Sequence, residues 1–289
     1  MSIEYKIYED KFIEIDGVQT RYWESGTGDE TLVLIHGFNA SVEEWVANIP
    51  FFETHYRIIA LDMIGCGKSQ KPKVDYSYPA FTKFLHEFCK EKKIIKPHII
   101  GHSMGGSIAI HYAALHASEV KSLVLVAPSI FCWKFPAFFH LVSAPIFGKM
   151  LLRPPSSLEA LIAILRTFTY NPVEYSEESI KAMYEMQHVK GYAKPLLRFI
   201  RTYMTLFGIK KRRCADLADS TKAALSKINF PVLLFWGKQD TIVHYKAAND
   251  TAANIPNCEL VTYDECGHCP NFEYPDDFIK SATSLIVAF

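Results

Sequence analysis

Short apolar runs alternate along this chain with segments long enough to form helices, and this alternation limits the possible folds more than any other feature. Four such runs lie in the first part of the chain: TLVLIHG, YRIIALD, PHIIGHS and KSLVLVAP. Each run is continuous rather than alternately polar, which is typical of strands buried on both faces. The segments between them include residues 79–93 and 104–116, which are long enough for helices. The sequence therefore predicts an α/β fold with a mostly parallel sheet covered by helices on both faces.

A long stretch in the middle of the chain interrupts this alternation. The strand pattern stops near Ser129 and resumes at Asn229 with NFPVLLFWG and then NCELVTYDECGH. Between these points the sequence shows helical periodicity broken by prolines. We therefore predict that residues 1–129 and 229–289 form one core, and that residues 130–228 form an all-helical insertion between two strands of its sheet.

Charge and cysteine content exclude several other classes of protein. The 289 residues include 31 basic and 31 acidic side chains, so no electrostatic attraction to nucleic acid is expected. The seven cysteines are scattered, which favours a reducing compartment, and MSIEYKIYEDKF lacks the features of a signal peptide. The most apolar stretch, residues 131–152, is interrupted by lysines and prolines. We expect a cytoplasmic protein with no nucleic-acid partner and no transmembrane segment, and no feature indicates an oligomeric state.

A serine lies between two glycines where a predicted strand meets a predicted helix. Gly101-His102-Ser103-Met104-Gly105 fits the pattern G-x-S-x-G, in which side chains at the flanking positions would collide across a sharp turn. The turn would hold the Ser103 hydroxyl out at the carboxyl edge of the sheet, where open α/β folds bind ligands. It would also place the Met104 N–H at a helix N-terminus, facing developing negative charge. Ser103 is therefore a candidate nucleophile.

Two further residues could activate this serine. Asp240 follows the predicted strand VLLFWG, and His268 follows CELVTY, which gives the chain order Ser, Asp, His of nucleophile-elbow hydrolases. His268 would accept the Ser103 proton and Asp240 would orient the imidazole. Alternatively, Asp240 is only the N-cap of a following helix. The Phe38 N–H, after Gly37 in LVLIHGFNAS, would be the second oxyanion donor.

These pieces together resemble the α/β-hydrolase fold family over nearly the whole chain. The matching stretches are residues 36–38, 62–69, 101–105, 237–240 and 267–275. The resemblance implies a core of about eight strands with a variable helical lid inserted after the sixth strand. Residues 130–228 occupy that position.

The resemblance also implies a range of activities. Family members with serine at the elbow are mostly carboxylesterases, lipases, thioesterases and hydrolases that cleave carbon–carbon bonds of dienoate ketones. The glycine-rich loop of many carbon–carbon hydrolases is replaced here by HGFNAS. We expect a cofactor-independent serine hydrolase that cleaves a carboxylic ester with a hydrophobic acyl or alcohol part. The alternatives are a carbon–carbon bond hydrolase of the meta-cleavage product type and a non-catalytic ligand receptor on the same fold.

Other potential ligand residues surround the predicted site. Cys266 and Cys269 flank His268, but structural zinc usually needs four ligands at paired spacings, so we expect no metal there. His36 and His102 are expected to have structural roles and to be satisfied by loop backbone.

Residues 131–152, in the predicted lid, are dense in aromatic and aliphatic side chains. Phe135, Phe138 and Phe139 are spaced so that they would share one face of a helix, although Pro136 favours a helix start there. Three interpretations are open: packing within the lid or on the core, an apolar wall for the substrate, and weak contact with a membrane surface. We take the three phenylalanines as candidate substrate-binding residues.

Overall fold

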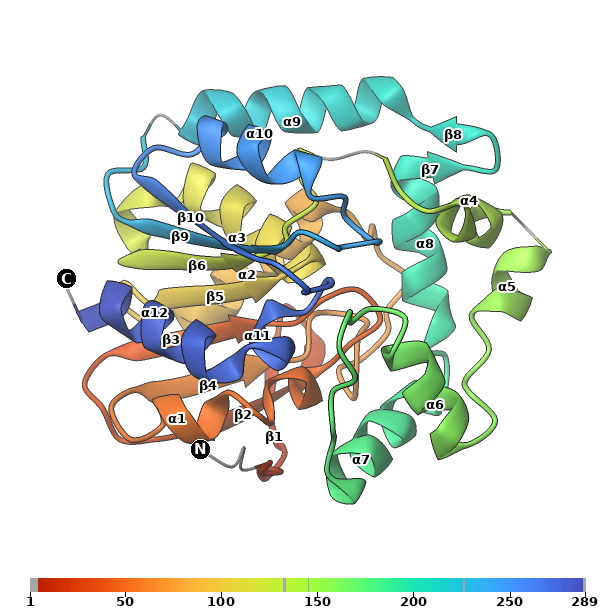
Figure 1. The fold of residues 1–289 in the computed structure, drawn as a ribbon, viewed down its shortest axis with the longest axis horizontal. Helices are drawn as coiled ribbons and strands as arrows, with labels where there is room; N and C mark the ends of the chain where they lie inside the picture. The colour runs from red at the N-terminus through yellow and green to blue at the C-terminus, as the bar shows by residue number, and fades with distance from the viewer. Residues whose placement is uncertain (1–4, 132–133, 145, 226, 288–289) are drawn as a thin grey trace.

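The computed structural model describes residues 5–131, 134–144, 146–225 and 227–287, and its centre is a twisted eight-stranded sheet (Figure 1). The strand order is β1-β2-β4-β3-β5-β6-β9-β10. The strands are β1 Lys11–Ile15, β2 Val18–Ser25, β3 Thr31–Ile35, β4 Arg57–Leu61, β5 His98–His102, β6 Ser122–Val126, β9 Val232–Gly237 and β10 Cys258–Tyr263. Among the described strands of this sheet, only the pairings β1 with β2 and β2 with β4 are antiparallel, which confirms a mostly parallel sheet.

Helices cover both faces of this sheet, because its central strands are apolar on both sides. Along β3, Val33 and Ile35 belong to one buried cluster, and Leu32 and Leu34 belong to the other. The first cluster lies under α2 Tyr78–Glu91, α3 Met104–Leu115 and α10 Lys246–Asn254. The second lies under the 3₁₀ helix η1 Val42–Trp45, α1 Ile49–Phe52 and α12 Pro275–Val287. The remaining core elements are η2 Ala117–Glu119 and α11 Pro270–Glu273. The α/β prediction is confirmed.

The segment between β6 and β9 contains the inserted helices. In Figure 1 most of them stand beside one edge of the sheet, whereas the last of them runs next to α10, over a face of the sheet. The inserted helices are α4 Ala137–Ser143, α5 Phe147–Leu151, α6 Leu158–Leu165, α7 Glu177–Gln187, α8 Ala193–Tyr203 and α9 Lys211–Leu225. The prediction of an all-helical insertion was wrong in one detail. Two short strands, β7 Met204–Thr205 and β8 Gly208–Ile209, pair antiparallel around a tight turn. Gly208 has φ of 148°, which favours glycine and allows the chain to reverse there.

Within the described residues, no helix is both long enough and apolar enough to cross a bilayer.

Candidate active site

Ser103 occupies a sharp turn between β5 and α3, with φ of 52° and ψ of −111°. A Cβ atom at Gly101 would lie 2.6 Å from the Gly105 carbonyl oxygen, and one at Gly105 would lie 2.1 Å from the Ile35 carbonyl oxygen. A Cβ atom cannot approach a carbonyl oxygen so closely, so both positions require glycine, as the sequence predicted. The Ser103 N–H donates to the Val126 carbonyl oxygen at 2.8 Å, which fixes the turn against β6. The unusual backbone is therefore imposed by close packing.

Asp240 and His268 form a buried pair that joins the loops after β9 and β10. The distance from Asp240 Oδ2 to His268 Nδ1 is 2.7 Å. The other carboxylate oxygen, Oδ1, accepts the N–H groups of Ile242 and Val243 at 2.8 and 2.9 Å. Asp240 therefore caps the turn before α10, which begins at Lys246, while it also contacts the imidazole. The alternative interpretation, that Asp240 is only the N-cap of the following helix, was wrong, because the N-cap of α10 is Tyr245.

Ser103 and His268 both line one cavity of about 500 Å³ between the sheet edge and the insertion. Phe38 and Met104, the predicted oxyanion donors, line it too. Gly65 and Gly67 place the 62–69 loop against the same cavity. The structure thus brings the predicted nucleophile, base and oxyanion residues to one opening, with Asp240 buried behind His268.

The loop before Phe38 passes very close to the nucleophile. A Cβ atom at Gly37 would lie 3.5 Å from Ser103 Cβ and 3.1 Å from His102 Nδ1, so the close approach of the two segments favours glycine. The Gly37 N–H donates to Glu44 Oε2 at 2.8 Å. A side chain from η1 therefore holds the loop that would supply the second oxyanion donor.

Glu44 also contacts the elbow, and sequence analysis missed this. Its Oε1 lies 2.7 Å from His102 Nδ1, and His102 Nε2 lies 3.0 Å from the His268 carbonyl oxygen. Both imidazole nitrogens thus face oxygen acceptors, as in a protonated ring. Burial alone would lower the pKa of His102, but the Glu44 carboxylate raises it well above its usual value. Glu44 therefore links the loop that contains Gly37 to the elbow, and through His102 it is also linked to the loop that contains His268.

The other flanking residues have structural contacts. His36 Nδ1 lies 2.8 Å from the Gly37 carbonyl oxygen, and the Met63 N–H donates to His36 Nε2 at 3.1 Å, which confirms its expected backbone contacts. His102 differs from that expectation because one of its partners is the Glu44 side chain. Within the described part of the chain, Cys266, His268 and Cys269 are not among the side chains whose donor atoms could share one metal ion.

The candidate substrate residues of the insertion lie at the cavity. Phe135, Phe138 and Phe139 all line it, and α4 begins at Ala137, directly after Pro136. Phe139 packs against Phe38 with ring centroids 5.9 Å apart. Sequence analysis missed a further part of the wall, which comes from α7 and α8. These side chains are Met183, Met186, Leu196, Phe199, Ile200 and Tyr203. The amphipathic pattern of α8 was the available signal, but it does not specify what the apolar face covers.

Known proteins resemble this chain in sequence and in fold. A curated relative, the 2-hydroxy-6-oxo-6-(2'-aminophenyl)hexa-2,4-dienoic acid hydrolase of Metapseudomonas resinovorans, is 28% identical and covers 96% of this chain and 91% of its own. The human monoacylglycerol lipase ABHD6 is 26% identical, with 90% of this chain and 74% of that protein covered. The solved structure of a meta-cleavage product hydrolase from Pseudomonas fluorescens IP01 superposes with a TM-score of 0.78 at 22% identity, over 99% of both chains.

The family comparison covers most of the chain. Residues 30–275 match the model of the alpha/beta hydrolase fold, a span that runs from β3 through the insertion to the final helix. The candidate nucleophile, base and acid, Ser103, His268 and Asp240, all lie within this span. The chain therefore belongs to the α/β-hydrolase fold family and is a hydrolase.

Proposed function

We propose that this protein is a serine hydrolase that cleaves carboxylic esters with a hydrophobic acyl or alcohol part. Ser103 attacks the ester carbonyl as His268 accepts its proton, and Asp240 holds the imidazole in the required tautomer. The N–H groups of Phe38 and Met104 stabilise the oxyanion. His268 then protonates the departing alcohol, and water releases the acid from the acyl-enzyme. No cofactor is needed for these steps.

The observation that carries this proposal is the cavity onto which Ser103 and His268 open. Its volume of about 500 Å³ suits a small molecule, and most of its wall is apolar. The transfer of each methylene group from water into an apolar cavity is favourable by about 0.8 kcal/mol. A substrate with a hydrophobic chain next to its ester bond therefore fits this site.

We assign the lid function to the inserted segment, residues 130–228. Phe135, Phe138 and Phe139 would contact the hydrophobic part of the substrate, since all three line the cavity. Helices α7 and α8 would complete this wall. Substrate preference would then depend mainly on the insertion, while the reaction itself depends on the core.

The second candidate is carbon–carbon bond hydrolysis, and two observations favour it. The dienoic acid hydrolase from M. resinovorans aligns over 91% of its own length, compared with 74% for ABHD6. Lys71 and Arg153 also line the cavity and could pair with a substrate carboxylate. A neutral ester has no use for such a cation, whereas a dienoate does.

A direct competition of substrate classes tests the proposal. We expect p-nitrophenyl esters of rising acyl length to be turned over much faster than the dienoate acid named for the bacterial relative. Faster cleavage of the dienoate would replace the ester proposal with the second candidate. If neither class is turned over but long-chain ligands bind tightly, the protein is a ligand receptor on this fold.

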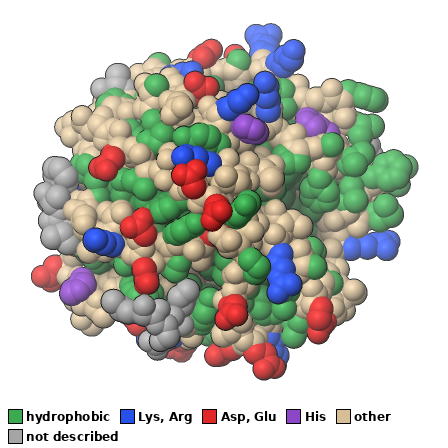
Figure 2. Space-filling view, in the orientation of Figure 1, with side chains coloured by type: hydrophobic (Ala, Val, Ile, Leu, Met, Phe, Trp, Pro, Cys, Tyr) green, Lys and Arg blue, Asp and Glu red, His purple; other side chains and the backbone are tan. Residues whose placement is uncertain are grey.

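The insertion also offers a surface for weak contact with lipid. Figure 2 shows hydrophobic side chains gathered at the edge of the molecule where Figure 1 places α4, α5 and the β7–β8 turn. Phe207, at the tip of that turn, is 96% exposed, and Ile146 is 81% exposed. Lys149 lies in α5, and the basic run 210–213 follows β8. We propose that this lid face rests on anionic bilayers, with apolar groups inserted and basic groups at the headgroups.

A further inference from the structure

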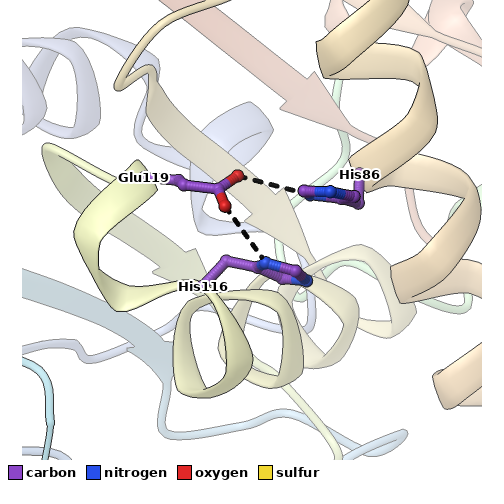
Figure 3. A group of neighbouring side chains, drawn as sticks. All are labelled: His86, His116 and Glu119. Carbon is purple, nitrogen blue, oxygen red and sulfur yellow. Dashed lines mark ion pairs between the residues drawn. The ribbon is translucent and has the colours of Figure 1, made fainter.

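Three side chains with metal-binding donors meet on the surface of the core, away from the catalytic edge. His86 comes from α2, His116 directly follows α3, and Glu119 belongs to η2 (Figure 3). Their donor atoms all lie within 4.8 Å of one another. Two imidazoles and one carboxylate form a ligand set that zinc uses in proteins. We propose that these three residues bind a divalent transition-metal ion of the zinc class.

The spacing of the donor atoms fits a bound ion. Glu119 Oε2 lies 3.3 Å from His86 Nδ1, and Glu119 Oε1 lies 3.4 Å from His116 Nδ1. Charge-assisted hydrogen bonds are usually shorter, at about 2.7–2.9 Å. Ligands bonded at about 2.0–2.2 Å to a tetrahedral ion lie about 3.3–3.6 Å apart. The carboxylate is thus separated from each imidazole by the edge length of a zinc tetrahedron. The two imidazole rings stack with centroids 4.2 Å apart and 13° between their planes, so one ring would turn about its side-chain torsions when both nitrogens bind the ion.

The hydrogen bonding of His86 gives a second, independent indication. Its Nδ1 atom is buried, and it has no hydrogen-bond partner among the described residues despite the nearby carboxylate. A buried nitrogen without a partner destabilises the fold. A metal ion at this position would satisfy the lone pair of that nitrogen.

The surroundings orient the carboxylate and leave room for solvent. The Tyr112 hydroxyl donates to Glu119 Oε2 at 3.3 Å, which is the kind of outer contact that fixes a metal ligand. The side chains of His86 and His116 are 29% and 24% exposed, and that of Glu119 is 46% exposed. A hydrated ion can therefore reach the group and keep water as a fourth ligand.

The position of the site determines its expected role. Ser103 precedes the first residue of α3 and His116 follows its last, so the two ends are separated by the length of a 12-residue helix. At 1.5 Å per residue this is about 18 Å, too far for the ion to touch substrate. The ion would tie α2 to the end of α3 and stabilise the fold, and this inference does not depend on the proposed ester hydrolysis.

Zinc titration of the chelator-treated full-length protein tests the site. We expect calorimetry to show one zinc ion bound per chain and the Tm to rise with zinc concentration. His86→Ala and Glu119→Gln should each weaken binding at least tenfold, since each removes one of three ligands. His188→Ala, which removes an exposed histidine of the insertion, should bind as the wild type does.

Cobalt substitution identifies the ligand atoms and shows whether the ion binds to cysteine instead of to the three proposed residues. Cobalt held by imidazole and carboxylate absorbs weakly in the visible range and lacks the intense thiolate charge-transfer band. The proposal is overturned by a thiolate band, by the absence of saturable binding at one equivalent, or by unchanged zinc affinity in folded His86→Ala or Glu119→Gln protein. Circular dichroism of both variants establishes that they are folded.

Discussion

The loops at the catalytic edge of the sheet and the inserted helices beside them are held by different kinds of contact. At the catalytic edge the contacts are short, buried and polar, such as the 2.7 Å contact of Glu44 with His102 and that of Asp240 with His268. On the insertion side of the cavity they are aromatic. The Phe38 ring lies 6.0 Å from the Phe199 ring, centroid to centroid.

The difference determines what each region can specify. A hydrogen bond between buried polar groups restricts both distance and angle, so it can hold the candidate catalytic atoms in one arrangement. Aromatic packing tolerates a range of tilts and offsets, so the insertion can change its side chains without disturbing the edge of the sheet. We therefore assign the reaction to the core and the choice of substrate to the insertion. The five predictions below test this division.

The largest effect is expected for Ser103→Ala, which removes the proposed nucleophile from the core. Ester hydrolysis should fall by a factor on the order of 10⁴ or more, because the remaining groups can only bind and polarise the ester. Labelling by a fluorophosphonate probe should be lost, while the Tm stays close to that of the wild type. Peptide mapping of the labelled wild type checks the site, and a label on another serine would show that the nucleophile was misassigned.

Glu44→Gln should leave the triad in place but loosen it. Amide and carboxylate have similar shapes, but the amide cannot accept hydrogen bonds at both positions that now hold Gly37 and His102. We expect kcat to fall roughly 10- to 100-fold with little change in KM, because small displacements of catalytic groups act on the transition state.

Glu43→Gln is the matched control for this variant. Glu43 neighbours Glu44 in η1, but its carboxylate contacts Arg21 at 2.6 Å and Ser41 at 2.5 Å rather than Gly37 or His102. Glu43→Gln should lower the Tm but should not cause the fall in kcat that is expected for Glu44→Gln. Equal kinetic effects of the two variants would mean that Glu44 has no particular role in positioning the site.

Lipid binding is the third test, and it concerns the outer face of the insertion. Phe207→Asp should weaken binding to vesicles of phosphatidylcholine and phosphatidylglycerol by about tenfold, the effect of losing roughly 1.4 kcal/mol of apolar insertion. Ile95→Asp is the control, since Ile95 is 84% exposed but lies outside the insertion. Equal losses in a sedimentation assay, or no binding by the wild type, would count against the lid surface.

Chain-length preference is the fourth test, and it concerns the inner face of the insertion. With the wild type, kcat/KM should rise about fourfold for each added methylene until the cavity is full, as expected from about 0.8 kcal/mol per group. Phe138→Ala and Phe139→Ala should shift the preferred length or flatten the trend, whereas Phe207→Ala should not. An unchanged profile in both cavity variants would place the substrate pocket elsewhere.

The smallest expected effect concerns stability and pH. Burial alone would raise the pKa of Glu44, but its contact with His102 lowers it, and the same contact raises that of His102. The Glu44 carboxylate stabilises the fold fully above the pKa of an unfolded glutamate, about 4.5, and the His102 imidazolium does so below the pKa of an unfolded histidine, about 6.5. The pair therefore stabilises the fold most between about pH 4.5 and 6.5. The Tm difference between wild type and Glu44→Gln should peak there and shrink on both sides. A difference that does not vary with pH would contradict the ion pair.

Local chemistry made the fold and the three candidate catalytic residues predictable. Apolar runs of strand length predict buried strands, and the crowding around Ser103 requires glycine at Gly101 and Gly105 whatever the rest of the chain does. The order of Asp240 and His268 after later strands follows from the same strand pattern. Such signals extend over a few neighbouring residues, so they can be detected in the sequence without knowledge of the tertiary structure.

Tertiary structure alone decided the contacts between distant segments. His102 lies 58 residues from Glu44 along the chain, and nothing near either residue indicates the partner. In the same way, α2 and α3 bring His86 to His116, and α7 and α8 bring their apolar faces to the cavity. These arrangements depend on how helices pack on the sheet, which is set by the summed shapes of many buried side chains. The sequence by itself determined the candidate reacting groups, and packing determined what holds and surrounds them.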